Sequence, residues 1–231
     1  MARIIVILVG LLMATLASSH AVALDLDIRR SPHNSLDFSM LVHHDNLELQ
    51  NNDAVVDTRL NRIGVLVYDV PEHAKVHFGL NLGYAFVSHS QQALFDGEDL
   101  DGFFLGVSMR TVVLQSASAR LMFLANYLFQ DVSGESTTHN LSLTWNEINT
   151  SLLLSYDLNA SIKLAAGVNG GWIKATQKAK GLTAQTLRLA PEPNAGFVIN
   201  VGYRLSGNES VGIQAHTGYL QGLQLQFQRW F

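Results

Sequence analysis

Hydrophobic and polar residues alternate along several stretches of the chain with a period of two. In the clearest stretch, residues 75–86, one face carries Val76, Phe78, Leu80, Leu82, Tyr84 and Phe86 and the other carries Lys75, His77, Gly79, Asn81, Gly83 and Ala85. This period predicts β-strands, because successive side chains of a strand point to opposite faces of a sheet. The alternation recurs in residues 102–110, 161–172, 197–206, 211–216 and 223–231.

Four further segments predict strands with a less regular pattern, namely residues 36–42, 59–70, 121–129 and 139–158. In the last of them the hydrophobic positions change parity near Asn146 and Glu147, which predicts a β-bulge. Together the segments predict about ten antiparallel strands, with eight or twelve as alternatives. Residues 24–28 belong either to an extra N-terminal strand or to an extension of the first one.

The connections between these strands alternate in length. Short segments rich in turn-forming residues lie at 71–73, 115–119, 157–160 and 206–209, and longer polar segments lie at about 44–57, 91–101, 131–138 and 175–195, with a brief fifth at 217–221. Pro191 and Pro193 favour a loop over a paired strand. Alternating short and long connections are typical of a closed antiparallel transmembrane β-barrel, which has short periplasmic turns and longer outer loops.

Composition indicates which face of the barrel meets water. Charged residues make up only 15% of the chain and hydrophobic residues 48%. The polar face is rich in Gly, Ser, Asn and Gln, whereas the exterior of a soluble barrel would carry more Lys and Glu. Aromatic residues near the strand ends, such as Trp172 and Tyr203, fit the girdles found at membrane interfaces. We therefore expect an apolar outer surface that contacts lipid.

The polar face then lines the lumen. The predicted lumen-lining residues are Lys75, His77, Asn81, Arg110, Lys163, Asn169, Asn200, Arg204 and Gln214. Small barrels are filled by their own side chains, so we expect a mostly plugged, hydrogen-bonded interior.

The N-terminus has the layout of a secretory signal peptide. Arg3 precedes an apolar run from Ile4 to Ala17, and Ala21-Val22-Ala23 supplies a small-residue cleavage site. Cleavage after Ala23 would leave residues 24–231 as one outer-membrane β-barrel domain; an uncleaved anchor is the alternative. The chain contains no cysteine, which excludes disulfides and thiolate metal sites.

The C-terminal segment carries a resemblance to a known class. Leu223, Leu225, Phe227 and the terminal Phe231 alternate as in the C-terminal signal strand of bacterial outer-membrane β-barrel proteins, while Arg229 departs from that pattern. The chain thus resembles the small outer-membrane barrels that include OmpA-type and YfaZ-like proteins. The resemblance implies an outer-membrane location, contact with membrane lipids and lipopolysaccharide, and recognition of this strand by the barrel-assembly machinery.

No chemical motif in the sequence points to a specific activity. His89-Ser90 and His216-Thr217 are the nearest approach to a nucleophile beside a base, and the histidine spacing matches no metal-ligand pattern. A net charge of -4 gives no reason to expect a nucleic-acid partner. We expect no cofactor or metal, and a non-enzymatic protein with a structural or surface-loop interaction role. The alternatives are a narrow polar pore and an enzyme acting on lipid or lipopolysaccharide.

Overall fold

The computed structural model describes residues 35–51, 54–71, 74–90, 98–135, 139–181, 184–191, 195–218 and 221–231. The predicted signal peptide and residues 24–28 lie outside these ranges. No helix among the described residues is long and apolar enough to cross a membrane. The strands are β1 (Ser35–Asn51), β2 (Ala54–Val70), β3 (Val76–Ser90), β4 (Asp99–Gln115), β5 (Ala119–Glu135), β6 (His139–Asp157), β7 (Ile162–Gly181), β8 (Gln185–Pro191), β9 (Ala195–Ser206), β10 (Glu209–His216) and β11 (Gln221–Trp230).

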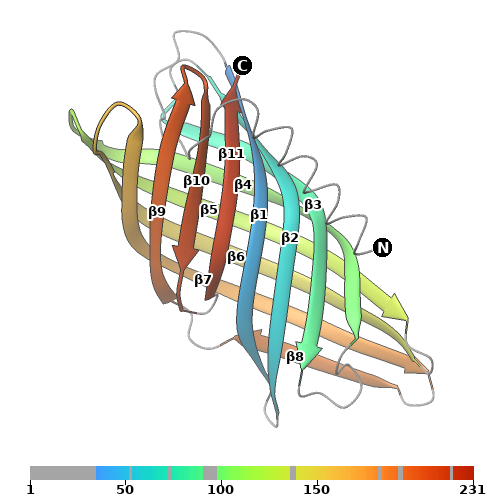
Figure 1. Cartoon of the computed structure of the whole chain (residues 1–231). Helices are drawn as coiled ribbons and strands as arrows, with labels where there is room; N and C mark the ends of the chain where they lie inside the picture. The colour runs from blue at the N-terminus through green and yellow to red at the C-terminus, as the bar shows by residue number, and fades with distance from the viewer. Residues whose placement is uncertain are drawn as a thin grey trace.

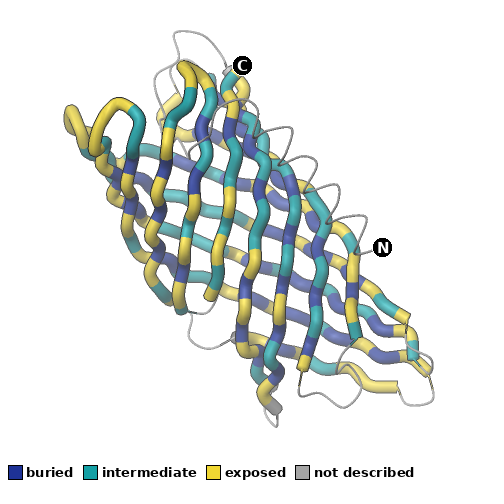
Figure 2. The backbone as a smooth tube through the Cα atoms, viewed as in Figure 1, coloured by how far each residue is buried: buried dark blue, intermediate teal, exposed yellow. Residues whose placement is uncertain are grey.

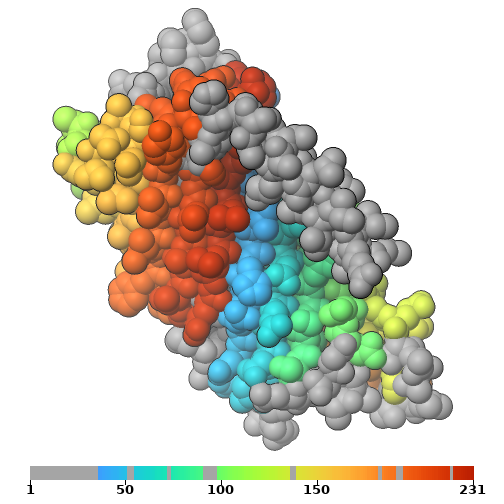
Figure 3. All heavy atoms as spheres, in the orientation of Figure 1, coloured from blue at the N-terminus to red at the C-terminus, as the bar shows by residue number. Residues whose placement is uncertain are grey.

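Ten of these strands form a closed antiparallel ring in the order β1 to β7, then β9, β10 and β11. The ring closes where β11 pairs with β1, and the backbones of Leu36 and Phe231 exchange two hydrogen bonds there, of 3.3 and 3.0 Å. Figure 3 shows this seam, with the blue β1 directly against the red β11. The predicted fold, a closed antiparallel barrel of about ten strands, is confirmed. Closure gives every ring strand a partner on each side, which a hydrocarbon environment requires.

The eleventh strand, β8, lies outside the ring of ten. It pairs with the end of β7 through residues 185–189 and then reaches β1, where Pro191 lies opposite Leu49 (Figure 1). The expectation that Pro191 lies in a loop is therefore wrong. Proline is tolerated here because it is the last residue of a short strand, where a missing N–H group breaks no long ladder.

The outward-facing residues of β1 to β7 change from apolar to polar once along each strand. On β1, the outward residues Phe38, Met40 and Val42 are followed by His44 and Glu48. Each of the other six strands shows the same change, in which an apolar outer face becomes polar toward the end of the barrel farther from Phe231. The first polar outward residues after the change are His44, Asn61, Ser88, Asp101, Asp131, Asn146 and Lys174.

The inward-facing residues change from polar to apolar at about the same level along the strands. Nearer the termini the interior is mostly polar, and beyond the change it becomes a hydrophobic core. Figure 2 shows inner, more buried positions alternating with outer, more exposed ones along the strands in both parts of the barrel. The buried core residues are Leu47, Leu49, Val56, Leu60, Ala85, Val87, Leu100, Phe104, Leu128, Val132, Leu141, Leu143, Trp145, Ile173, Ala175, Ala179 and Leu189.

The barrel therefore has two sections. The distal section consists of β8 and the parts of β1 to β7 that begin at the first polar outward residues given above; the membrane section is the rest of the ring. Strands β9 to β11 stop at the level of the change, so β1 to β8 form a smaller ring in the distal section. The membrane section is apolar outside and mostly polar inside, as expected in lipid. The distal section has the opposite polarity, as in a water-soluble barrel.

This division corrects two predictions. The β-bulge near Asn146 and Glu147 is wrong, because β6 keeps one continuous register with both β5 and β7. The hydrophobic parity changes there because the strand passes from lipid to water while its core becomes apolar. Most of the predicted long loops at 44–57, 131–138 and 175–195 are likewise strand, since their polar residues face water from the distal section. The short turns predicted at 115–119, 157–160 and 206–209 are confirmed.

Candidate functional site

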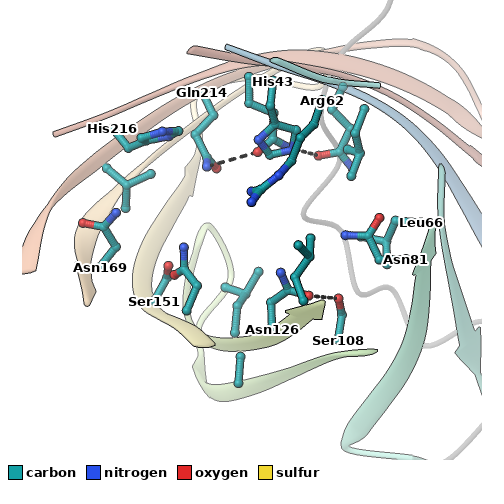
Figure 4. Close-up of a pocket in the computed structure, with 18 of the residues that line it drawn as sticks. His43, Arg62, Leu66, Asn81, Ser108, Asn126, Ser151, Asn169, Gln214 and His216 are labelled. Carbon is teal, nitrogen blue, oxygen red and sulfur yellow. Dashed lines mark hydrogen bonds between the residues drawn. The ribbon is translucent and has the colours of Figure 1, made fainter. Parts of the chain in front are cut away.

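The membrane section encloses a cavity of about 180 Å³. Side chains from strands around the whole ring point into it (Figure 4), including His43 and Arg62 on one side and Ser108 and Asn126 on another. Amides are the most numerous kind of polar side chain in the lining. They are Asn81, Asn126, Asn149, Asn169, Gln214, Gln224, Gln226 and Gln228.

A chain of amides follows the inner face of β10 and β11. Gln214 donates to Gln224 at 3.4 Å, and Gln224 donates to Gln226 at 3.4 Å. Gln226 in turn donates to the Ser39 hydroxyl at 2.8 Å across the closing seam of the barrel. Because amides both donate and accept, a row of them satisfies itself without any net charge.

The boundary between the two sections is crossed by a buried ion pair. Arg62 on β2 donates from Nη2 to Glu147 Oε2 at 2.8 Å and from Nε to Gln130 Oε1 at 3.0 Å. The indole of Trp145 donates to the same carboxylate oxygen at 3.2 Å. Arg62 and Glu147 are 4% and 3% exposed, and their strands lie four positions apart in the ring of ten. The pair therefore spans the lumen and forms one end of the cavity.

Phe104 adds an apolar layer beside this ion pair. Its ring lies over two glycines of neighbouring strands, so that a Cβ atom on Gly64 or Gly83 would come within 2.5 or 2.6 Å of Phe104 Cζ. Glycine at these two positions lets the aromatic ring lie directly on the wall of the barrel. Beyond this layer lies the hydrophobic core of the distal section.

Toward the termini, the interior is filled by a second group of charges. Arg110 Nη1 lies 2.5 Å from Asp37 Oδ2, which also accepts a hydrogen bond of 2.5 Å from Gln228. The Arg110 guanidinium stacks 4.1 Å from the ring centroid of Tyr68. These contacts join β1, β2, β4 and β11, so they also hold the closing seam together.

A third ionic cluster lies on the inner face of β5, β6 and β7. Asp157 pairs with Arg120 at 3.2 Å and with Lys163 at 3.4 Å. Asp157 stands at the end of β6 next to the turn into β7, so this cluster occupies the terminus-proximal end of the lumen.

Buried histidines form two separate hydrogen-bonded pairs. His216 Nε2 lies 2.6 Å from Asp45 Oδ1 at the end of the membrane section, and both side chains line the cavity. His89 Nδ1 lies 2.9 Å from the Thr58 hydroxyl inside the distal section. Burial lowers the pKa of His89 to about 4, so this imidazole is neutral at physiological pH. No group of three His, Asp or Glu residues in the described ranges is arranged to hold a metal ion.

The residues predicted to line the lumen are placed as follows. Asn81, Arg110, Asn169 and Gln214 line the cavity. His77, Lys163 and Asn200 are buried on the inner face, and Arg204 is partly buried beside Lys163 in a small pocket near the termini. Lys75 differs from expectation, because the strand begins at Val76 and Lys75 is exposed in the preceding turn.

The charged residues that close the lumen are not among the predicted lumen-lining residues. Arg62 and Glu147 lie in residues 59–70 and 139–158, two of the four segments with a less regular pattern, which does not indicate whether these side chains face the lumen. One signal was available: a charged residue in the middle of a predicted transmembrane strand has to face the lumen, because lipid disfavours it.

The terminal residues predicted to form the assembly strand lie at the seam. Leu223, Leu225 and Phe227 face outward on β11, and Phe231 follows it with an exposed ring. Arg229, which departs from the usual pattern, pairs with Glu209 of β10 at 3.3 Å and lies 5.1 Å from the ring centroid of Phe231.

Comparison with known proteins identifies the fold. No family model and no curated protein matches the sequence. The translocator domain of the autotransporter NalP from Neisseria meningitidis superposes with a TM-score of 0.52 at 10% identity, covering 96% of this chain and 93% of that one. The COG4313 outer membrane channel from Pseudomonas putida F1 gives 0.47 at 15% identity, over 89% and 98% of the two chains. The outer membrane protease OmpT from Escherichia coli gives 0.49 at 10% identity, over 87% and 98%. The fold is that of the bacterial outer-membrane β-barrels.

Proposed function

We propose that this chain is a non-enzymatic integral protein of the bacterial outer membrane whose lumen is closed and whose distal section presents a β-sheet surface outside the membrane. Its role is then structural or one of interaction through this surface and the loops beyond it. The distal section has a polar exterior on every strand from β1 to β8 and a hydrophobic core of its own. A surface of this kind is built for water rather than for lipid.

The observation that carries the proposal is the ion pair between Arg62 and Glu147. Together with Trp145 and Phe104 it fills the lumen where the cavity would otherwise continue into the distal section. Water and ions cannot cross a close-packed hydrophobic core without its opening.

A planar-bilayer recording tests the closed lumen. Purified protein is expected to give no discrete conductance steps at moderate voltage, and the variant Glu147→Ala, which removes the carboxylate partner of Arg62, is expected to give brief, small openings. The variant Glu209→Ala, whose salt bridge lies on the outer surface near the termini, is the control. Steady conductance of the unmodified protein would contradict the proposal.

A narrow polar pore is the second candidate, and one specific observation favours it. Asn81 Oδ1 and Asn169 Oδ1 are buried without a hydrogen-bond partner among the described residues, and both side chains line the cavity. Unsatisfied amide oxygens of this kind suit water or a small polar solute. Under this alternative the ion pair between Arg62 and Glu147 would act as the constriction, and the same recording separates the two functions.

The proposal that the protein is not an enzyme is supported by how its catalytic-type groups are distributed. The imidazole–carboxylate pair of His216 and Asp45 joins β10 to β1 at the boundary between the two sections and contains no hydroxyl, whereas the imidazole–hydroxyl pair of His89 and Thr58 joins β3 to β2 inside the distal section and contains no carboxylate. A nucleophile, a base and an acid have to share one site to act as a triad. Mass spectrometry of lipid A from cells with and without the protein tests this point, and a changed acylation pattern would contradict it.

Two finer proposals come from the resemblance of the C-terminal segment. We propose that β11 and Phe231 are recognised by the barrel-assembly machinery, and that the protein groups with the OmpA-type or YfaZ-like small barrels. Exposure of Leu223, Leu225 and Phe231 on the outer face supports the first of these. Deleting Phe231 is expected to lower the amount of folded barrel in the outer membrane while leaving synthesis unchanged.

A further inference from the structure

The outer face of the distal section is unevenly charged. Strand β7 places Lys174, Lys178 and Lys180 on this face, and the neighbouring β8 adds Arg188. All four side chains are exposed, and within the described part of the chain none of them belongs to an ion pair. We call these four residues the basic strip.

Pairing between strands keeps carboxylates away from the basic strip. Arg188 lies opposite Thr176, so it stands between the levels of Lys174 and Lys178. On the other side of β7, the outward residues of β6 are uncharged hydrogen-bonding side chains. In register with residues 174 to 180 they are Asn146, Thr144, Ser142 and Asn140.

On the β6 side of the strip, the nearest outward carboxylates among the described residues lie one strand farther away, on β5. Asp131 is opposite Thr144 and accepts its hydroxyl hydrogen bond at 3.3 Å, and Glu135 is opposite Asn140. Two strand spacings put β5 about 10 Å from β7. Within the described ranges, the positive charge of the basic strip is therefore left without an ion-pair partner.

The position of the basic strip relative to the membrane identifies what it faces. Lys174 comes two residues after Trp172, the last apolar outward residue of β7 and half exposed at 49%. Tryptophan at such a level marks the membrane interface. From Lys174 to Lys180 the strand rises roughly 20 Å along its own axis, and less along the tilted barrel's axis. The strip thus begins at the headgroup layer and extends outward from it.

We propose that the basic strip on β7 and β8 binds the phosphate groups of the glycolipid in the outer leaflet. This inference deepens the proposed function, on which it rests for the outer-membrane location. The short turns lie at the end of the barrel near the termini, which is the periplasmic end of an outer-membrane barrel, so the distal section faces the cell exterior. Lipid A carries phosphates at the level where Lys174 emerges, and a fork-shaped guanidinium such as that of Arg188 suits a phosphate. Donors on β6, among them Asn146 and Ser142, complete a surface with hydrogen-bonding capacity and no opposing charge.

Binding of lipid A to the full-length mature protein in detergent micelles tests this inference. The probes are bisphosphorylated lipid A and the same lipid without phosphates, with bound lipid counted by native mass spectrometry across a titration. The triple variant K174Q/K178Q/R188Q is expected to bind bisphosphorylated lipid A at least tenfold more weakly, since each basic residue near an anionic surface contributes on this scale. The lipid without phosphates is expected to bind equally weakly to both proteins.

A matched control variant distinguishes binding at the basic strip from a general effect of the protein's positive charge. Arg59 on β2 is an exposed outward arginine of the same distal section, with Asn46 and Ser88 as its paired neighbours and Asp57 two residues away on the same face. Arg59→Gln is expected to change lipid A binding less than twofold, whereas Arg188→Gln alone is expected to weaken it several-fold. Equal losses in these two variants would overturn the assignment of the site.

Three other results would also overturn the inference. They are unchanged binding by the triple variant, equal binding of the two lipids by the unmodified protein, and competition by millimolar inorganic phosphate strong enough to displace the lipid. Unboiled gel mobility shows that each variant is folded. Bilayer recording on the same preparations separates the two proposals, because a conducting protein that still binds lipid A through the basic strip contradicts only the closed lumen. Both proposals place the distal section on the outside of the cell. Single cysteines introduced into this section and labelled on intact cells by a reagent that does not cross the membrane test that orientation.

Discussion

Arg62 and Glu147 meet across the interior of the barrel at 2.8 Å, although 85 residues separate them in the chain. The contact stands at the boundary where the interior changes from polar to apolar. On its distal side the strands pack around a hydrophobic core, and on the side nearer the termini they surround the amide-lined cavity. The ion pair thus lies where the membrane section, which is apolar outside, meets the distal section, which is polar outside.

Removing one partner of this pair is expected to be far worse than removing both. Glu147→Leu leaves Arg62 buried without its carboxylate, and we expect a loss of about 3–5 kcal/mol in the free energy of unfolding. The double variant R62L/E147L is expected to recover most of that loss, because neither charge is then left unpaired. Urea unfolding in lipid vesicles, followed by tryptophan fluorescence, measures both. A double variant that is as unstable as Glu147→Leu would contradict the importance of the charge pairing.

Phe104 and Gly83 give a second prediction about the wall of the barrel. A methyl group on Gly83 would come within 2.6 Å of Phe104 Cζ and within 2.2 Å of the Ile63 carbonyl oxygen. Gly83→Ala is therefore expected to lower the free energy of unfolding by about 1–3 kcal/mol through overpacking. Gly207→Ala is the matched control, since nothing lies within 4 Å of the Cβ position at this turn. Equal unfolding midpoints for the two variants would show that the ring does not lie against Gly83.

His89 makes the stability of the distal section depend on pH. Its pKa is lowered by burial from 6.5 to about 4, so folding favours the neutral imidazole. The stabilisation is complete above about pH 6.5 and is lost as the pH falls toward 4, because the unfolded segment then binds a proton that the folded one excludes. The expected loss at pH 4 is on the order of 2–3 kcal/mol.

Limited proteolysis of the barrel in micelles tests this dependence. The ratio of cleavage rates at pH 4.5 and pH 7, measured for the distal loops, is expected to be larger for the unmodified protein than for His89→Gln, which has no proton to gain at this site. The protease is chosen to be stable at both pH values. Its cleavage rate on an unstructured peptide at each pH corrects for the pH dependence of the protease itself. Identical ratios for the two proteins would show that His89 is not held neutral by its surroundings.

The alternation of residues was sufficient to predict the membrane section. Between Phe78 and Phe86, or between Phe197 and Leu205, hydrophobic side chains occupy every second position because one face meets lipid and the other a polar lumen. The number of strands in the ring, the short turns and most lumen residues follow from that pattern alone. Lys75 was misplaced because a strand end is less well determined by alternation than its middle.

The distal section could not be identified by the same rule, because its polarity is reversed. In β6 the apolar residues Leu141, Leu143 and Trp145 face inward, whereas Ile148, Leu152 and Leu154 face lipid. A rule that assigns every apolar residue to lipid has to place a bulge between these two groups. Similarly, outward polar residues such as Glu48 and Lys178 are hard to distinguish from loop residues. The ion pair between Arg62 and Glu147 depends on how the closed ring brings distant strands together, which no local pattern contains.

The reversal of polarity itself can be tested on one face of one strand. Leu152 and Ser142 both face outward on β6, the first in the membrane section and the second in the distal section. Leu152→Arg is expected to destabilise the barrel by about 2–4 kcal/mol, since it exposes a charge to hydrocarbon, whereas Ser142→Arg is expected to change stability little because its side chain meets water. Urea unfolding in vesicles provides the comparison. If β6 instead had a bulge and both residues faced the same lipid, the two arginine variants would be destabilised alike.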